Sequence, residues 1–448
     1  MNTPICDFVR EYVEKGPLRL HMPGHKGAAF LGCEPLDLTE VGGADSLCAP
    51  GGIIRESEKN AAALFGAGDT LYSTEGSSQC IRAMVYLARL AWSSRREGGR
   101  PLIIAGRNAH KSFLSAAALL DVDVHWLFPE NPDYSLCRCQ ISPAALEAAL
   151  RERPRAAGVY LTSPDYLGNQ ADLLALSAVT DRYSAPLLVD NAHGAYLAFL
   201  DPSRHPIALG ADLCCDSAHK TLPVLTGGAY LHLSSAAPAA FFTHAREAMA
   251  LFGSTSPSYL ILQSLDLANR YLGDGYAGKL QDAVNTLGAF KARLALKGWG
   301  MIDGEPLKLT LDAKSWGYTG GELGACLEAQ GIVPEYADPD WLVLMPVPEN
   351  LPETLERLEA VLSGVERREP LATRPPVLRR TEACLTVRDA LLSPKRRVGL
   401  EEAGGKILAS LAASCPPAVS PAMPGERLGS NALEIYRYYG VDELWVAE

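Results

Sequence analysis

The sequence lacks the long apolar runs and the leading segment that mark membrane and exported proteins. No uninterrupted apolar run reaches ~18 residues, about the length that a membrane-spanning helix requires. Residues 1–7 do not show the basic-then-apolar pattern of a secretory signal. We therefore expect no membrane helix and place the chain in the cytoplasm.

An excess of positive charge is also missing. The chain has 41 Lys and Arg against 52 Asp and Glu, which gives a net charge of −11 and a pI of about 5.4. Nucleic-acid binding calls for a basic face, so this balance argues against such a partner. With 448 residues, 48% of them hydrophobic, the chain is long enough for two or three ordinary globular domains.

Cysteine pairs with metal-ligand spacing are the third absence. The eleven cysteines are spread thinly, and neither Cys137 with Cys139 nor Cys214 with Cys215 has the paired spacing of a zinc site. We interpret them as core thiols in a reducing cytoplasm and expect no metal.

Short apolar runs alternate with helical patterns from about residue 36 to residue 290. The runs expected as strands are 70–72, 102–105, 122–128, 158–162, 186–189, 213–215 and 228–232. The patterns expected as helices are 58–65, 79–92, 112–120, 143–151, 172–183 and 257–271. This alternation predicts an α/β fold with a largely parallel sheet covered on both faces.

Changes of composition suggest four segments. We expect an N-terminal arm at 1–35 with a short helix, a large domain at 36–290, a small α/β domain at 291–372 and a C-terminal domain at 373–448. The Pro-rich stretch 370–376 marks the last junction. Within the C-terminal domain, the pattern at 401–413 predicts a helix.

Chemically useful side chains follow several of the expected strands. Lys220 comes after the apolar run 211–215, and Asp190 ends the run before it. Ligands of parallel sheets bind at the carboxyl ends of the strands. A lysine and an acid on neighbouring strand ends suit pyridoxal 5'-phosphate (PLP), because the lysine can bind it covalently and the acid can pair with its pyridine nitrogen. A surface lysine and a simple helix cap are the alternatives.

A second group suits an anion. Gly76, Ser77 and Ser78 follow a strand and open a helix, so free backbone amides and hydroxyls form a nest for a phosphate. An ordinary serine N-cap is the alternative. His110 also stands between a strand and a helix, where it can lie flat on an aromatic ring or simply cap the helix. Ala192 is small enough to pack under a flat ring.

At this point the sequence resembles the ornithine/lysine/arginine decarboxylase family, a branch of the fold type I, aspartate-aminotransferase-like PLP enzymes. Motifs from the arm to near the end carry the resemblance: LHMPGHKG at 20–27, RNAHKS at 107–112, LTSPDYLG at 161–168, VDNAHG at 189–194, DSAHKTL at 216–222, STSPSY at 254–259 and LEEAGGKI at 400–407. The chain is similar to the short bacterial members, which have no receiver-like domain at the N-terminus.

The resemblance implies a role for each matching residue. Lys220 would hold PLP, Asp190 would bind its pyridine nitrogen and His110 would stack on its ring. The remaining cofactor-binding positions are Gly76, Ser77, Ser78, Ala192, His193, Ser217 and His219. Thr255 and Ser256 match a segment that reaches the phosphate from the other subunit, which implies a homodimer with shared active sites, while a higher oligomer stays open. Glu426 matches a segment near the distal end of the substrate, where an acid suits a cationic side chain.

The resemblance implies decarboxylation of a basic amino acid, in the context of polyamine metabolism. Arginine is favoured over lysine and ornithine because the chain is similar to the short members. Lys220 or His219 would return the proton. An aminotransferase or another PLP lyase remains the alternative, because one fold serves several reactions. The sequence departs from the family at Asn191, where an acid is usual, and at 415–420. The roles of His21, His25 and Lys26 stay open.

Overall fold

The structure is a computed structural model that describes residues 1–94, 98–130, 135, 137–410 and 420–448. The chain divides into two compact units. The first comprises Met1–Ile104, Leu146–Leu161 and Asp172–Ala277, and the second comprises Ala105–Ala145, Thr162–Ala171 and Gly278–Glu448. The division into four segments stays a prediction.

A seven-stranded sheet confirms the predicted α/β class. Its strands stand in the order β1-β7-β6-β5-β4-β2-β3. Their bounds are β1 (Asp69–Ser73), β2 (Leu102–Gly106), β3 (Asp123–Leu127), β4 (Gly158–Thr162), β5 (Leu187–Asp190), β6 (Leu213–Asp216) and β7 (Ala229–Leu233). Strands β5 and β6 pair in parallel, whereas β7 runs antiparallel to both β1 and β6. All seven expected strands are present.

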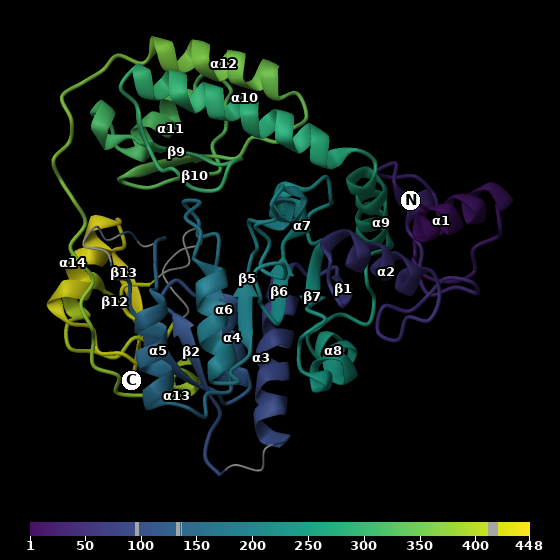
Figure 1. Cartoon of the computed structure of the whole chain (residues 1–448), viewed down its shortest axis with the longest axis horizontal. Coiled ribbons are helices and arrows are strands. Elements are labelled where there is room, and N and C mark those ends of the chain that lie inside the picture. Colours follow the sequence, from purple (N-terminus) through teal and green to yellow (C-terminus); the bar gives the residue numbers. More distant parts are fainter. Residues whose placement is uncertain (95–97, 131–134, 136, 411–419) are drawn as a thin grey trace. The chain divides into compact units, whose positions relative to one another are not determined.

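The strands that matter most for the site are buried along their whole length. All four residues of β5 and all four of β6 are buried. Strands covered on both faces read as continuous apolar runs, and this explains why both were visible in the sequence. Figure 1 shows β5, β6, β7 and β1 side by side, with α3 alongside them.

Among the residues that the structure describes, eight helices lie mainly in the first unit. They are α1 (Pro4–Lys15), α2 (Ile53–Phe65), α3 (Ser77–Ser94), α5 (Pro143–Glu152), α6 (Leu173–Arg182), α7 (Ala218–Thr221), α8 (Ala239–Phe252) and α9 (Tyr259–Gly273), with the 3-10 turns η1 (Glu34–Leu36) and η2 (Ala195–Phe199). Helix α1 is the short helix expected in the arm. The carboxylate of Asp266 on α9 anchors it by accepting the backbone N–H groups of Ile5 and Cys6, each at 3.0 Å.

The second unit contains two further antiparallel sheets. One has the order β10-β11-β9-β8 and the other pairs β12 with β13. Their bounds are β8 (Gly300–Met301), β9 (Leu309–Asp312), β10 (Tyr336–Ala337), β11 (Trp341–Leu344), β12 (Lys395–Gly399) and β13 (Glu443–Ala447). The helices are α4 (Lys111–Leu119), α10 (Tyr276–Leu296), α11 (Gly320–Glu328), α12 (Leu351–Gly364), α13 (Val387–Leu392) and α14 (Ser430–Tyr438), with η3 (Lys314–Trp316) and η4 (Leu400–Glu402).

The helix predicted at 401–413 is wrong for the residues that the structure describes. Only η4 is helical there, and 411–413 lie outside the described residues. Two adjacent glycines follow, and Gly405 has a φ of 75°, a left-handed conformation that ends a helix. The next apolar residues, Ile407 and Leu408, form isolated bridges with Arg427 and Val446. Leu408 is fully buried in the C-terminal core, so tertiary pairing overrides the local pattern.

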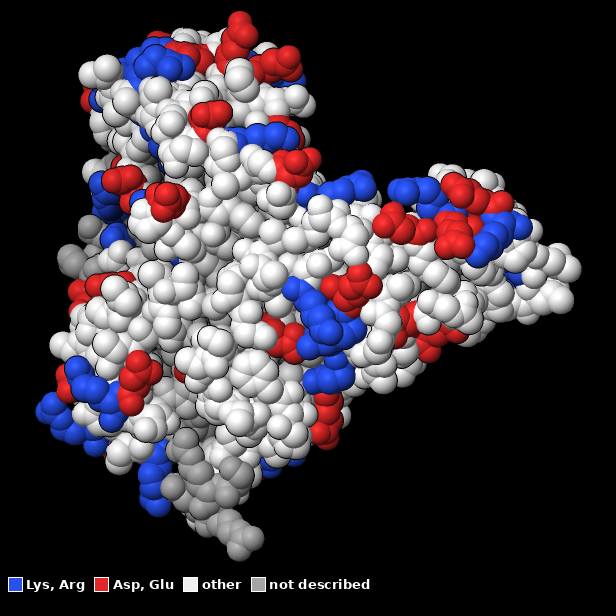
Figure 2. Space-filling view, turned by 45° about the vertical axis from the view of Figure 1, so that its right-hand side comes forward, with Lys and Arg blue, Asp and Glu red and all other residues white. Residues whose placement is uncertain are grey.

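None of the described helices is long and apolar enough to cross a membrane. Figure 2 shows Lys and Arg side chains interspersed with Asp and Glu on the face that it draws. The ten cysteines that the structure describes are free thiols.

Candidate functional site

Lys220 lies directly beyond the carboxyl end of β6. The strand ends at Asp216, Ser217 follows, and Lys220 stands on the one-turn helix α7. The side chain is half-buried, and its Nζ atom lies 3.0 Å from Nε2 of His193. His193 follows the neighbouring strand β5, so the segments after two adjacent parallel strands meet at this amine. This is the position at which parallel sheets bind ligands.

Asp190 ends β5 beside this lysine-bearing strand. In the pairing of β5 with β6 it lies opposite Cys215, and it is 3% exposed. Its Oδ2 atom accepts a hydrogen bond from the hydroxyl of Tyr160 at 3.0 Å. Its Oδ1 atom accepts the backbone N–H of Ala192 at 3.1 Å and the thiol of Cys215 at 3.6 Å. Several donors therefore fix the position of the carboxylate.

The nest expected for a phosphate also lies in the first unit. Gly76 has a φ of 72° and is followed at once by helix α3, which begins at Ser77. Ser217 donates a hydrogen bond to the hydroxyl of Ser77 at 2.7 Å, although the two residues are 140 positions apart. The structure thus brings together the serine after β1 and the serine after β6. Ser78 lies on the first turn of the same helix.

His219 and the glycines before β7 complete the group of residues around the expected phosphate nest. The backbone N–H of Gly76 donates to the carbonyl of Gly227 at 2.8 Å, and His219 Nδ1 lies 3.0 Å from the carbonyl of Gly228. Gly227 has a φ of 100°, and a Cβ atom there would meet the carbonyl oxygen of Thr74 at 2.9 Å. Glycine is therefore required for this close approach of two backbone segments.

Other predicted residues lie elsewhere. Thr255 and Ser256 are exposed in the segment between α8 and α9 of the first unit. His110 belongs to the second unit, where its Nδ1 atom accepts the backbone N–H of Ser112 at 3.2 Å and so caps helix α4. The capping role that the sequence left open is therefore present. The stacking role of His110 remains a prediction.

Glu426 also belongs to the second unit, in a buried ion pair that the sequence did not reveal. Arg107 donates through Nη1 to Oε1 and through Nη2 to Oε2, both at 2.6 Å. Oε2 further accepts the hydroxyl of Thr381 at 2.6 Å and the backbone N–H of Met423 at 2.8 Å. The guanidinium of Arg107 therefore balances the charge of Glu426 within the protein.

A buried cluster around Asp216, the last residue of β6, was also not predicted from the sequence. His205 and His232 each direct Nε2 at Oδ2 of Asp216, at 3.0 and 3.1 Å. The amide of Asn191 donates to the other oxygen of Asp216 at 2.6 Å. Burial by itself raises the pKa of Asp216, but the two histidines outweigh it and hold that pKa well below its usual range. Burial lowers the pKa of His232, so this ring is neutral and its Nε2–H can donate.

The same cluster offers three ligand atoms within 4.8 Å of one another, an arrangement that could hold a metal ion. Its hydrogen bonds favour another interpretation. The backbone N–H of Ile207 points at Nδ1 of His205 at 3.4 Å, which places the proton of the ring on Nε2. A protonated Nε2 has no lone pair for a metal and instead donates to Asp216. We interpret the cluster as a hydrogen-bonded support for the strand end that precedes Lys220.

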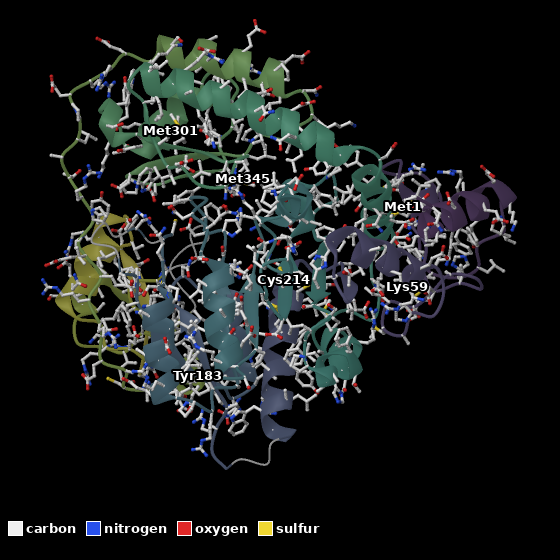
Figure 3. All side chains as sticks on the ribbon, in the orientation of Figure 1. Met1, Lys59, Tyr183, Cys214, Met301 and Met345 are labelled. Carbon is white, nitrogen blue, oxygen red and sulfur yellow. The ribbon has the colours of Figure 1, made fainter. Side chains whose placement is uncertain are left out.

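The cysteine thiols near Asp190 are unreactive. Cys214, labelled in Figure 3, and Cys215 both lie in β6, and Cys80 lies on α3. Burial raises the pKa of each of these three thiols. They remain protonated at neutral pH, so they act as weak donors and apolar packing groups rather than nucleophiles.

A family model decides the affiliation of the chain. The model described as Orn/Lys/Arg decarboxylase, major domain, matches residues 3–310. The chain belongs to the Orn/Lys/Arg decarboxylase family. The resemblance that the sequence motifs suggested is thereby confirmed for more than half of the chain.

Individual proteins also match over nearly the whole chain. The uncharacterized protein YaaO of Bacillus subtilis (strain 168) is 29% identical over 464 residues, which cover 97% of this chain and 93% of that protein. An arginine decarboxylase of the same strain is 28% identical over 459 residues, with 95% and 91% covered. The crystal structure of the Francisella novicida lysine decarboxylase LdcF matches with a TM-score of 0.82 and 17% identity, covering 100% of this chain and 81% of that one. This structural likeness shows fold type I.

Proposed function

We propose that the protein is a PLP-dependent decarboxylase of a basic amino acid, arginine in preference to lysine or ornithine, and that it releases the matching amine and CO2. One observation carries the proposal. Lys220 follows β6, and Asp190 ends the adjacent strand β5, while Ser77 after β1 and Ser217 after β6 form a hydrogen-bonded pair, in a chain of the family whose members include decarboxylases. Release of such an amine would place the protein in polyamine-related metabolism.

The residues of the first unit fit PLP by their chemistry. Lys220 supplies a half-buried amine, and Asp190 supplies a carboxylate held by hydrogen bonds. The hydroxyls of Ser77 and Ser217 already converge at 2.7 Å at the start of a helix, where free backbone amides favour an anion. Gly76, Ser78 and His219 would complete the phosphate site, and Ala192 would pack under the ring. PLP, when bound, supplies the sink for the electron pair that is left on the substrate Cα when CO2 departs.

The protein's own side chains would control charge and protons around that step. Asp190 would keep the pyridine nitrogen protonated, because an ionised acid favours a neighbouring positive charge. His193 Nε2 lies 3.0 Å from Lys220 Nζ, so a proton can be shared between these two atoms. Lys220 or His219 would then deliver a proton to the substrate Cα. His110 would hold the ring from its face.

Substrate choice is proposed to involve Glu426. An acid suits the distal cation of arginine or lysine. Arg107 already balances its charge, however, so the attraction for a substrate cation would be weaker than that of an unpaired carboxylate. The Oε1 atom accepts from Arg107, whereas Oε2 accepts from three donors. We therefore propose Oε1 as the atom that would meet a substrate.

A homodimer with shared active sites is part of the proposal. Thr255 and Ser256 are exposed, as residues that serve another subunit would be in a single chain. The first unit also exposes five large apolar side chains between residues 18 and 31, namely Leu18, Leu20, Met22, Phe30 and Leu31. A second subunit could cover such side chains. The free thiols support the reducing cytoplasm as the location.

Product analysis tests the proposed reaction. Purified protein with added PLP is given arginine, lysine and ornithine separately, each with and without a 2-oxo acid, and amines and CO2 are measured. We expect the amine of one substrate together with CO2, in yields that do not depend on the oxo acid. Transfer of the amino group to the oxo acid without CO2 would replace decarboxylation with transamination on the same fold.

A further inference from the structure

We propose that Tyr160 is a positioning residue for the cofactor: its hydroxyl holds the carboxylate of Asp190 in place to pair with the pyridine nitrogen of PLP. The inference rests on the proposed function, because it gives Asp190 the role assigned there. Neither the family motifs nor the sequence pattern pointed to this tyrosine. Its hydrogen bond to the Oδ2 atom of Asp190, at 3.0 Å, is the observation that suggests the role.

The fold explains how the hydroxyl reaches the carboxylate. Tyr160 lies on β4, which neighbours β5 in the sheet, and the backbone N–H of Val159 donates to the carbonyl of Pro186 just before β5 begins. Asp190 stands at the far end of β5. The tyrosine side chain therefore extends along the sheet toward the carboxyl end, and its ring is fully buried. Burial among neighbouring side chains restricts the directions in which its hydroxyl can point.

The two oxygens of Asp190 have different donors, and this makes Tyr160 distinctive. Oδ1 accepts the backbone N–H of Ala192 and the weakly donating thiol of Cys215. Oδ2 accepts the phenol of Tyr160. A donor aimed at a carboxylate stabilises its charged form, and a buried carboxylate needs such donors because it has lost water. Removing the phenol oxygen removes the donor to Oδ2 while leaving the ring to fill its place.

The consequence for the cofactor follows from charge. A carboxylate paired with the pyridine nitrogen keeps that nitrogen protonated, and a carboxylate that is no longer held in place does so less completely. Tyr160→Phe should therefore weaken PLP binding and shift the pyridine nitrogen toward its unprotonated form. A hydrogen bond to a charged group is stronger than one between neutral groups, and Tyr160→Phe removes such a bond. We therefore expect affinity for PLP to fall about tenfold.

The chain provides a matched control. Tyr230 on β7 of the same sheet is also fully buried, but its hydroxyl has no hydrogen-bond partner among the described residues. Tyr230→Phe removes the same atom from a similar environment without touching Asp190. We expect its affinity for PLP to stay within about twofold of the wild-type value, because no hydrogen bond is lost.

The experiment measures PLP affinity by equilibrium titration for the wild type, Tyr160→Phe and Tyr230→Phe. It also records the NMR chemical shift of bound PLP labelled at the pyridine nitrogen. We expect weaker binding and a changed shift for Tyr160→Phe alone. A Tyr160→Phe protein with wild-type affinity and shift overturns the inference, even if its melting temperature falls, because the hydroxyl then serves only the fold.

A double-mutant cycle shows whether Tyr160 acts through Asp190. In an Asp190→Asn background, Tyr160→Phe should cause little further loss of PLP affinity, because the charge that it supports is gone. Equal losses in both backgrounds would overturn the proposed route. A wild-type protein that binds PLP but decarboxylates no amino acid refutes the proposed reaction and leaves this test intact. A wild-type protein that binds no PLP refutes both.

Discussion

Replacing Arg107 with methionine should show how much the buried ion pair with Glu426 contributes to the free energy of unfolding. Arg107 is 1% exposed and Glu426 is 5% exposed, and two hydrogen bonds of 2.6 Å join them. Removal of one partner of a buried ion pair costs about 3–5 kcal/mol, because the other charge is left buried. Two donors to Glu426 remain, from Thr381 and Met423, so we expect about 3 kcal/mol, the lower end of this range.

The double replacement Arg107→Met with Glu426→Gln should recover most of that loss. Both charges are then absent, and such replacements of a buried pair are often nearly neutral. Urea denaturation followed by circular dichroism would compare the wild type, both single variants and the double variant. Arg153→Met is the control, because its ion pair with Glu152 is largely exposed and should contribute less than about 1 kcal/mol. A double variant that loses the sum of both single losses would refute the reasoning, since the loss would then not come from unpaired charge.

Two further substitutions test buried groups of the first unit. Burial raises the pKa of Asp212 to about 6, above its unfolded value of about 3.9, so its contribution to stability falls as the pH rises through that window. Asp212→Asn keeps an acceptor for the backbone N–H at the start of β5. Between pH 4 and pH 7, the free energy of unfolding of this variant, measured by urea titration, should rise relative to that of the wild type by up to about 3 kcal/mol. A difference between the two proteins that does not vary with pH would contradict this. Asn191→Asp places a second carboxylate beside that of Asp216, whose Oδ1 atom lies 2.6 Å from the amide nitrogen of Asn191. Because the two negative charges repel one another, affinity for PLP should fall at least about tenfold at pH 8 and should recover in part at pH 6. Equal affinity at both pH values would show that the two carboxylates do not repel one another.

The strand-end motifs could be predicted from the sequence because each is local. A buried apolar run followed at once by a polar residue identifies both the strand and its carboxyl end, as at Asp190 and after β6. Glycine before a serine likewise marks the nest at Gly76. In these places local propensity and tertiary structure agree.

Contacts between distant segments could not be predicted in this way. Arg107 and Glu426 are 319 positions apart, and nothing in either local stretch specifies the other. The histidines that flank Asp216 stand 11 positions before it and 16 positions after it, and neither local stretch specifies the contact. Tyr160 read only as one apolar member of a strand, because its hydroxyl acquires meaning only when β4 lies beside β5.

Several helices were also missed, for different physical reasons. Helices α8, α10, α12, α13 and α14 were not expected, and α10 also crosses residue 290, where a domain boundary was placed. The segment at 401–413 had suitable residues for a helix, but its two glycines and its bridging partners in the C-terminal core decide otherwise. Propensity is a weak guide wherever tertiary pairing competes with it.

Mapping the lysine that carries the cofactor tests the central claim most directly. The protein is loaded with PLP, the lysine linkage is fixed by borohydride reduction, and the digested peptides are analysed by mass spectrometry alongside a Lys220→Ala variant. We predict that the modified peptide contains Lys220 and that the variant carries no modified peptide. Modification of a different lysine in the wild type, or unchanged modification of the variant, would contradict the placement of the site beyond β6.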